Sequence, residues 1–444
     1  MDRARLRDLL ARESADAERR NPRSRAAHER ADHLFGRVPM TWMNKTAGTF
    51  PRYLDSARGA RVRDLDGHEY IDFCLGDTGA MAGHSPAAVG DAVHRRFTVL
   101  GGATAMLPTE DAEWVGAELT RRFGLTRWSF SLTATDANRW AVRLARAVTG
   151  RPKILVNSYC YHGSVDESLI VTGPDGNGRA RPGNVGAPCD VTLTSRVAEF
   201  NDLEHLEREL AHGDVAAVLM EPALTNIGIV LPEPGYLAGV RELTRRHGVL
   251  LVNDETHTFS AGPGGCTAAW DLEPDVLTIG KAIGGGIPAG AYGLSADLAD
   301  RLLDLVDMGG VGGTLAGNAL SVAATRATLE HVLTDEAFTH MHKLSERFEA
   351  GVRAGVEAHG LPWSVSRLGA RTEYRFTAPA PRTGTEAATA GDTELEDFLH
   401  LYLANRGILL TPFHNMALMC PDTTEQDVDA HTELFASALA ELAG

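Results

Sequence analysis

Two residues of opposite charge follow neighbouring apolar runs near the middle of the chain. Asp254 ends the run 248–253, and Lys281 follows the run 276–280, with a glycine-rich stretch at 282–286 directly after it. A lysine amine forms a Schiff base with the aldehyde of pyridoxal 5′-phosphate (PLP), and a carboxylate paired with the ring nitrogen keeps the ring electron-accepting. The pair therefore indicates PLP chemistry, although either residue alone is more often a helix cap or a solvated loop residue.

Composition is ordinary for a soluble globular protein large enough for two domains. The chain has 444 residues, 43% hydrophobic and 23% charged, and a net charge of -16, which argues against a nucleic-acid partner. Its five cysteines are odd in number and widely spaced, so a disulfide framework or zinc site is not expected. No apolar stretch approaches the ~20 residues of a membrane span. We expect a cytoplasmic protein with no metal and no membrane partner.

Alternating apolar and amphipathic segments fill residues 95–330. The expected strands are 128–132, 153–157, 216–220, 249–253 and 276–280. This alternation predicts a mostly parallel sheet with helices on both faces, and ligands of such α/β sheets bind beyond the carboxyl ends of the strands. Glu221, Asp254 and Lys281 all follow expected strands, so we expect them at one edge of the sheet.

The domain organisation is expected to have four parts. They are an N-terminal helical segment, the N-terminal part of a smaller domain, the large PLP-binding domain and the C-terminal part of the smaller domain, at residues 1–36, 37–94, 95–330 and 331–444. Within the smaller domain, Asp66-Gly67 predicts the turn of a hairpin over 61–73. A polar insert at 378–393 predicts a mobile surface loop.

Two hydroxyl-bearing turns precede expected helices. Thr133, Ala134 and Thr135 follow the first strand of the large domain, and Gly313 and Thr314 precede a later helix. The free N–H groups and the positive dipole end of a helix N-terminus suit a phosphate. An ordinary threonine cap explains the first turn equally well, and a glycine-rich turn is weak evidence by itself.

Two further strand ends carry candidate cofactor contacts. Tyr161 and His162 follow the strand 153–157, where an aromatic ring could stack on a flat cofactor or simply pack on the sheet edge. Glu221 stands before Pro222, which by itself explains the end of that strand.

In order and spacing, these motifs resemble the class III aminotransferases of PLP fold type I, and within them the glutamate-1-semialdehyde aminomutase-like branch. The resemblance covers roughly residues 35 to 440, with landmarks at 66–73, 83–86, 143–146, 161–163, 221–222, 254–255, 280–286 and 313–314. It implies a large, mostly parallel-sheet domain and a smaller α+β domain built from the N- and C-terminal segments.

The resemblance also implies roles for individual residues. Lys281 is expected to form the Schiff base and carry the proton, and Asp254 to hold the pyridinium. Thr314 is expected to reach the phosphate of the neighbouring subunit, which implies a homodimer with its active site at the subunit interface. The other expected cofactor contacts are Thr133, Ala134, Thr135, Tyr161, His162, Glu221, Thr256 and Gly313.

The chain departs from the family pattern at several positions. Thr133-Ala134-Thr135 stands where members usually have Ser-Gly-Thr, and Thr256 stands where an apolar valine usually follows Asp-Glu. The substrate-binding arginine of the aminomutases has no counterpart in 39–45. Because that arginine is missing, substrate contacts are expected from Trp42, Lys45, His257 and His414.

Three functions are compatible with these residues. The first is a PLP-dependent aminotransferase that moves an amino group from an amino acid or amine to an oxo acceptor through a Lys281 Schiff base. The alternative is a glutamate-1-semialdehyde-type aminomutase, which shares every cofactor residue but shifts the amino group within one molecule. The third is a non-catalytic PLP-binding protein, which the altered phosphate turn favours and the retained Lys281 and Asp254 oppose.

Overall fold

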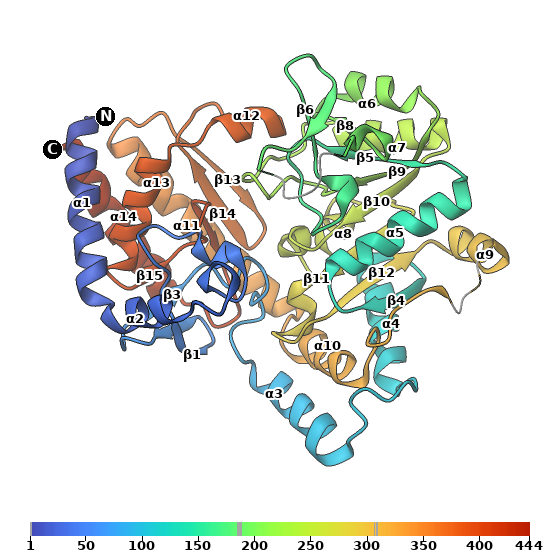
Figure 1. The fold of residues 1–444 in the computed structure, drawn as a ribbon, viewed down its shortest axis with the longest axis horizontal. Helices are drawn as coiled ribbons and strands as arrows, with labels where there is room; N and C mark the ends of the chain where they lie inside the picture. Colours follow the sequence, from blue (N-terminus) through green and yellow to red (C-terminus); the bar gives the residue numbers. More distant parts are fainter. Residues whose placement is uncertain (1, 184–188, 306, 308–309) are drawn as a thin grey trace. The chain divides into compact units, whose positions relative to one another are not determined.

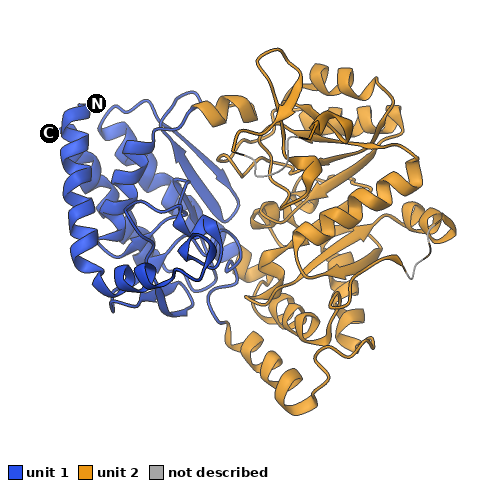
Figure 2. Cartoon of the chain, viewed as in Figure 1, with its two compact units in different colours: residues 1–85, 339–380, 390–444 blue, residues 86–338, 381–389 orange. Residues whose placement is uncertain are grey.

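The computed structural model describes residues 2–183, 189–305, 307 and 310–444. The chain divides into two compact units (Figure 2). Unit 1 contains residues 1–85, 339–380 and 390–444, and unit 2 contains residues 86–338 and 381–389. Met1, the first residue of the expected helical segment, lies outside the described residues.

The division falls after Ser85 and Phe338 rather than after residues 94 and 330. Helix α3 (Ala87–His94) belongs to unit 2 because it packs on α10 (Ala319–His331). Val89 on α3 forms a buried cluster with Ala324 and Ala327 on α10. Packing of α3 against α10 therefore places this boundary before α3 rather than after it.

Unit 2 is built on a seven-stranded sheet (Figure 1). Its strands, in spatial order, are β4 (Arg127–Ser131), β12 (Gly290–Leu294), β11 (Val276–Gly280), β10 (Leu250–Asp254), β9 (Val215–Met220), β5 (Lys153–Asn157) and β8 (Ser195–Ala198). Strand β12 runs antiparallel to both of its neighbours, and the pairs that do not involve β12 are parallel. The mostly parallel sheet is confirmed, and the five expected strands are all present.

Two strands of this sheet, β8 and β12, were not expected from the sequence. β12 carries two glycines at places where the backbone approaches its neighbours closely. A Cβ on Gly290 would lie 2.6 Å from the carbonyl oxygen of Thr133, and one on Gly293 would lie 2.8 Å from the Trp128 ring. Glycine is depleted in strands, so a strand that requires it gives a weak sequence signal.

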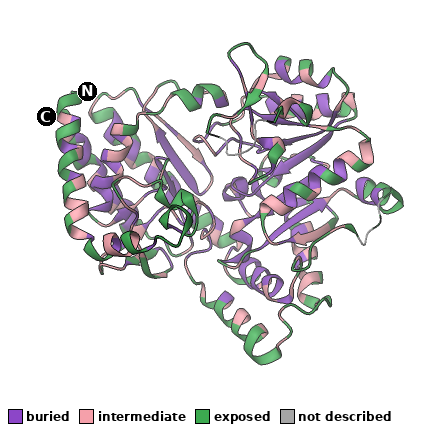
Figure 3. Cartoon of the chain, viewed as in Figure 1, coloured by how far each residue is buried: buried purple, intermediate pink, exposed green. Residues whose placement is uncertain are grey.

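Helices cover the sheet of unit 2. Helix α5 (Ala134–Thr149) packs on β11, β12 and β9, and its buried face contains Ala137, Ala141 and Leu144. Strands β9, β10 and β11 are buried along their whole length (Figure 3), as expected for parallel strands covered on both faces. The other elements of unit 2 are α4 (Glu110–Phe123), α6 (Leu203–Leu210), α7 (Tyr236–His247), α8 (Gly265–Ala269), α9 (Ala296–Leu305) and the hairpin β6 (Ile170–Thr172) with β7 (Gly178–Ala180).

Unit 1 is an α+β unit that combines the two ends of the chain. One sheet has the order β1 (Leu54–Arg58), β2 (Arg61–Asp64), β3 (Glu69–Asp72) and β15 (Ile408–Leu409). The other has the order β13 (Ser364–Leu368), β14 (Arg371–Arg375) and β16 (Met416–Leu418). The helices are α1 (Arg3–Arg20), α2 (Pro22–Arg30), α11 (Asp335–Ala358), which begins in unit 2, α13 (Thr393–Ala404) and α14 (Glu425–Ala443).

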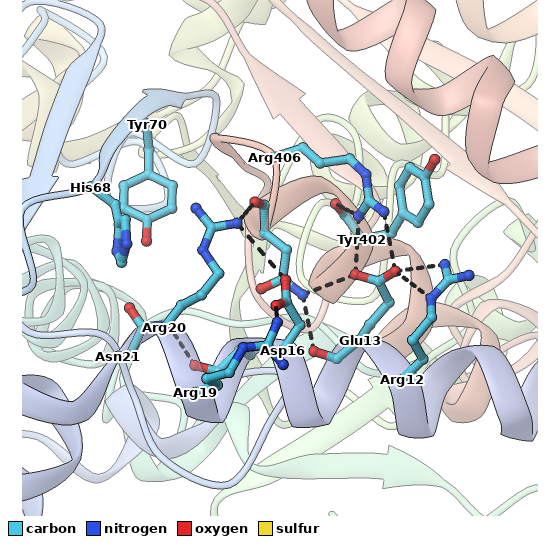
Figure 4. A network of polar contacts seen from close by, with 12 residues as sticks. Arg12, Glu13, Asp16, Arg19, Arg20, Asn21, His68, Tyr70, Tyr402 and Arg406 are labelled. Carbon is cyan, nitrogen blue, oxygen red and sulfur yellow. Dashed lines mark hydrogen bonds and ion pairs between the residues drawn. The ribbon is translucent and has the colours of Figure 1, made fainter.

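Unit 1 contains the expected hairpin and the expected N-terminal helical segment. Strands β2 and β3 pair antiparallel, with Gly67 in the left-handed region at φ 92°, so the hairpin is confirmed. The N-terminal helix α1 packs on α13 of the same unit, with Leu6 and Glu13 buried. Figure 4 shows the carboxylate of Glu13 between Arg406 and Arg12. The side-chain amide of Asn405 also donates to this carboxylate, at 2.9 Å.

The expectation of a mobile loop at 378–393 is wrong. This segment contains helix α12 (Gly384–Thr389), and residues 381–389 belong to unit 2. Ala387 is buried in the core of unit 2, and the Arg382 guanidinium donates to the Glu233 carboxylate at 2.8 Å. The polar composition of the segment gave no sign of the tertiary contacts that order it, which include a hydrogen bond from the Thr385 hydroxyl to Glu199.

Two features are absent from the part of the chain that the structure describes. None of its helices combines the length and apolarity needed to cross a membrane. It also contains no group of three or more His, Cys, Asp or Glu side chains placed to hold a metal ion.

Candidate active site

Lys281 lies at the carboxyl edge of the sheet, where β11 ends and the short helix η7 (Lys281–Gly284) begins. Its φ of 50° is in the left-handed region, which is costly for a residue with a Cβ and is typical of functional sites. The preceding residue must be glycine, since a Cβ on Gly280 would lie 2.8 Å from the amide nitrogen of Ala134. The lysine is therefore held beside the start of α5.

Asp254 ends the adjacent strand β10 and is buried, with 3% of its surface exposed. One carboxylate oxygen accepts a hydrogen bond from the Thr256 amide at 3.0 Å. The other accepts from the Asn138 side chain at 2.8 Å and lies 2.8 Å from Nδ1 of His162. A carboxylate has about four acceptor positions, so these three contacts leave room for one more donor.

The Asp254–His162 contact is an ion pair in a dry environment. Burial alone would raise the pKa of Asp254, but the hydrogen bonds from His162, Thr256 and Asn138 lower it well below the usual value. Burial alone would lower the pKa of His162, but Cys160 and Asp254 raise it well above the usual value. Asp254 is therefore held as an anion, the form that a protonated pyridine nitrogen needs.

Asn138 is a site residue that sequence reasoning missed. It lies on the buried face of α5, where it donates to Asp254 and accepts from the Thr278 hydroxyl at 2.6 Å. An asparagine among the alanines and valine of an apolar helix face was the available signal. That signal shows that a polar partner exists, but it does not identify the partner, which lies 116 residues away in the chain.

The turn before α5 fits a phosphate through its backbone. Thr133 is the N-cap of α5, and its hydroxyl accepts from the Asp136 amide at 3.2 Å and donates to the Asp136 carboxylate at 3.1 Å. The Thr133 side chain thus acts as an ordinary cap. The amides of Ala134 and Thr135 precede the first intrahelical donor, Ala137, so they belong to the first turn that can bind an anion.

The loop after β5 closes over this turn. Gly163, at φ 75°, approaches Thr135 so closely that a Cβ would lie 1.9 Å from the Thr135 hydroxyl oxygen. The Thr135 hydroxyl accepts a hydrogen bond from the Ser164 amide at 3.3 Å. Tyr161, in the same loop, is half-buried. The expected phosphate turn and the expected aromatic loop are therefore brought together.

The remaining candidates of unit 2 lie at three places. Glu221 is buried at the end of β9 and accepts from the Thr225 hydroxyl, while Thr256 is buried just after β10. His257 is nearly buried, and its Nε2 lies 2.7 Å from Nζ of Lys281. Gly313 and Thr314 are exposed in a turn before α10.

The remaining substrate candidates lie in unit 1. Nζ of Lys45 lies 5.4 Å and 5.7 Å from the ring centroids of Trp42 and Phe413, which fits cation–π contacts. His414 is buried with its Nδ1 3.3 Å from the Glu373 carboxylate. Burial opposes a charge on His414, but Glu373 raises its pKa above the usual value. A role of these residues toward substrate stays a prediction.

The residues of unit 2 fit PLP. The group needs an amine for its aldehyde, an anion for its ring nitrogen and N–H donors for its phosphate. Lys281, Asp254 and the first turn of α5 supply these at one edge of one sheet. Asp254 is buried and anionic before any ligand is added, so the arrangement is preorganised.

Comparison with known proteins agrees with this site. The family model for class-III aminotransferases matches residues 42–439. The chain is 36% identical over 403 residues to a glutamate-1-semialdehyde 2,1-aminomutase of Sorangium cellulosum, covering 89% of this chain and 91% of that protein. It is 32% identical over 407 residues to the protein of that name in Neisseria meningitidis, covering 89% and 94%.

Solved structures share the whole fold. A glutamate-1-semialdehyde-aminomutase from Pseudomonas aeruginosa PAO1 is 49% identical with a TM-score of 0.96, covering 100% of this chain and 99% of that one. A lysine-to-alanine variant of that protein has been solved in complex with PMP. An omega-transaminase from Sphaerobacter thermophilus is 30% identical with a TM-score of 0.86, covering 95% and 98%.

The match to the family model spans most of the chain, and it includes the strand ends that carry the lysine and the aspartate. The likeness to the solved structures extends over both units and identifies the fold as PLP fold type I. This chain therefore belongs to the class III aminotransferase family of PLP-dependent enzymes.

Proposed function

We propose that this enzyme is an aminomutase of the glutamate-1-semialdehyde type, which exchanges an amino and an oxo group on neighbouring carbons of one molecule. The observation that carries the proposal is the 49% identity to the Pseudomonas aminomutase over the whole chain, against 30% to the omega-transaminase. The curated relatives at 36% and 32% identity carry the same name. These findings favour the aminomutase over the expected two-substrate aminotransferase.

The residues of the site support amino-group chemistry in either case. When bound, PLP supplies the electron sink that allows a proton to leave the carbon bearing the amino group. Lys281 holds the proton that moves, at Nζ, beside the end of β11. His162 and Asn138 orient Asp254 and keep it charged, and the first turn of α5 would hold the phosphate. Burial of Asp254 excludes water from this ion pair.

A two-substrate aminotransferase is the second candidate. The segment 39–45 offers no arginine for a bidentate carboxylate contact, and the structure places Lys45 against the rings of Trp42 and Phe413 instead. Two aromatic rings beside one cation suit a substrate with an apolar part better than a short polar amino aldehyde with one carboxylate. This local chemistry favours a substrate other than glutamate-1-semialdehyde.

We propose a homodimer as the active unit, with the active site at the subunit interface. Unit 2 exposes five large apolar side chains within one short stretch, at Phe97, Val99, Leu100, Met106 and Leu107. Several exposed large apolar side chains in one short segment support a protein interface there. In such a dimer the exposed Thr314 would contact the phosphate bound by the partner subunit.

Light scattering measures the mass of the protein in solution and so tests the dimer. Thr314→Val is expected to weaken PLP binding only in the dimer. A cytoplasmic location stays a prediction.

The decisive experiment supplies glutamate-1-semialdehyde as the only substrate. An aminomutase converts it to the amino-oxo isomer without a second amino donor and without releasing a separate oxo acid. A panel of amino acids and amines is then added one at a time, and any free oxo product is identified. A stoichiometric oxo product from a donor alone, with no isomerisation of the semialdehyde, would establish the aminotransferase instead.

Lys281→Ala is the control for both outcomes. It removes the amine that binds the aldehyde, so nearly all turnover should be lost while the fold is retained. Normal turnover of Lys281→Ala would contradict both assignments, and it would favour a non-catalytic role for the lysine.

A further inference from the structure

A histidine touches the amine of the catalytic lysine. Nε2 of His257 lies 2.7 Å from Nζ of Lys281, a hydrogen-bond distance. His257 follows β10 by three residues and caps the short helix η6 (Thr258–Ala261). Only 9% of its surface is exposed, and Lys281 is half-buried, so the contact is partly screened from solvent. The imidazole therefore faces a reacting atom of the site.

Lysine chemistry needs a proton acceptor at this position. A lysine side chain in water is protonated at neutral pH, and an ammonium has no lone pair with which to attack an aldehyde or remove a proton. A base within hydrogen-bond distance removes this barrier. Histidine suits the task because its ordinary pKa of ~6.5 lets it accept and return a proton near neutral pH.

The nearby carboxylates are bonded to other groups. Asp254 is held by Thr256, Asn138 and His162, as described above. The buried Glu255 carboxylate accepts from the Thr258 and Thr267 hydroxyls and from the Cys266 and Thr267 amides. Burial raises the pKa of Glu255 despite these hydrogen bonds. These contacts turn both carboxylates toward partners other than the histidine–lysine contact.

We propose that His257 is a catalytic residue that exchanges a proton with Lys281. An N–H bond of the Nζ ammonium breaks as an N–H bond forms at Nε2 of the neutral imidazole, and the step reverses when the amine must be reprotonated. No electrons are transferred, so no further reactant is needed. The proposal rests on the lysine chemistry of the family and holds for an aminomutase and an aminotransferase alike.

The test measures how fast the full-length apoprotein captures PLP, which requires no substrate. Capture is followed by absorbance between about pH 6 and pH 9, a range that brackets the ordinary histidine pKa of ~6.5. Borohydride reduction and mass spectrometry confirm that the group is attached at Lys281. The variants are His257→Gln, which keeps a neutral hydrogen-bonding side chain, and His257→Ala, with and without added imidazole. His212→Gln, at an exposed histidine of unit 2, is the matched control.

The expected result is a pH-dependent defect. At pH 7 His257→Gln should capture PLP about 100-fold more slowly than the native protein, and the gap should close toward pH 9 as solvent removes the proton instead. Imidazole should restore part of the rate of His257→Ala, and His212→Gln should match the native protein.

Two results would overturn the proposal. Identical rates of PLP capture for His257→Gln and the native protein at every pH would show that the imidazole does not carry the proton. An equal loss at every pH, with no imidazole rescue of His257→Ala, would show that His257 only packs the site. Because the assay uses no substrate, its outcome is separate from the test of aminomutase activity.

Discussion

Two fully buried histidines, one in each unit, have pKa values shifted in opposite directions. His162 in unit 2 lies 2.8 Å from the Asp254 carboxylate. His431 on α14 of unit 1 packs among aromatic rings, with ring centroids 4.2 Å from Phe348 and 5.7 Å from Phe435. Within the described residues, neither ring nitrogen of His431 has a hydrogen-bond partner.

Burial lowers the pKa of both imidazoles, so the neighbouring groups cause the difference between the two pKa values. Burial lowers the pKa of His431 to about 3, and the ring stays neutral as an aromatic filler. The pKa of His162 is raised because Cys160 and Asp254 outweigh its burial. The charged imidazole of His162 thus lies beside the anion that the cofactor chemistry needs. The neutral imidazole of His431 only fills space in the core of unit 1.

The largest expected effect comes from removing the carboxylate. Asp254→Asn keeps the shape of the side chain but removes the charge that pairs with His162 and that we propose pairs with the ring nitrogen of the cofactor. We expect kcat/KM to fall by about 10³–10⁴-fold, comparable to the loss of a buried carboxylate that orients a catalytic histidine. Steady-state kinetics with a circular dichroism check of folding measures this. Activity within tenfold of the native enzyme would show that the anion is dispensable.

The second effect comes from the other half of the ion pair. His162→Phe leaves Asp254 buried with its charge uncompensated, so the free energy of unfolding should fall by about 3–5 kcal/mol. Denaturant unfolding of the apoprotein measures it. His431→Phe is the matched control, because it makes the same substitution at an equally buried position without an acidic partner. Equal losses in the two variants would contradict the comparison.

A smaller effect is expected where the N-terminal helix docks. Glu13→Gln replaces a carboxylate that accepts from Arg406, Asn405 and Arg12, and should cost about 1.5–3 kcal/mol of unfolding free energy. Burial opposes the charge, but these partners lower the pKa of Glu13. The contribution is therefore present above the unfolded pKa of ~4.3 and is lost as the pH falls, so the difference from the native protein should shrink in acid.

The smallest effect is expected from His431→Phe, and its sign depends on pH. Near pH 7.5 the variant should lie within about 1 kcal/mol of the native protein. As the pH falls below ~6.5, His431 of the native sequence is protonated in the unfolded state. In the folded state it stays neutral until about pH 3. Each pH unit in this window costs the native protein ~1.4 kcal/mol that the variant does not lose. A difference that is the same at pH 7.5 and pH 5.5 would refute this account.

Local pattern was sufficient for much of the fold. Buried parallel strands are continuous apolar runs, so β9, β10 and β11 were visible without the structure. Strand β12 was not, because its two glycines are needed for close backbone approach rather than for strand propensity. Helix α12 was also not predicted, because tertiary contacts rather than composition order it. A buried alanine, an ion pair and hydrogen bonds with Glu199 and Asn201 order a segment whose composition is that of a loop.

The sequence by itself was enough to predict the lysine, the aspartate and the PLP chemistry that they imply, because together they follow two apolar runs of an alternating α/β pattern, where ligand-binding residues lie beyond the carboxyl ends of the strands. Only the tertiary structure decided which polar groups meet. His257 and Lys281 are 24 residues apart in the chain, and His162 and Asp254 are 92 apart. These pairs form when the strands align side by side, and a pKa depends on neighbours in space rather than in sequence.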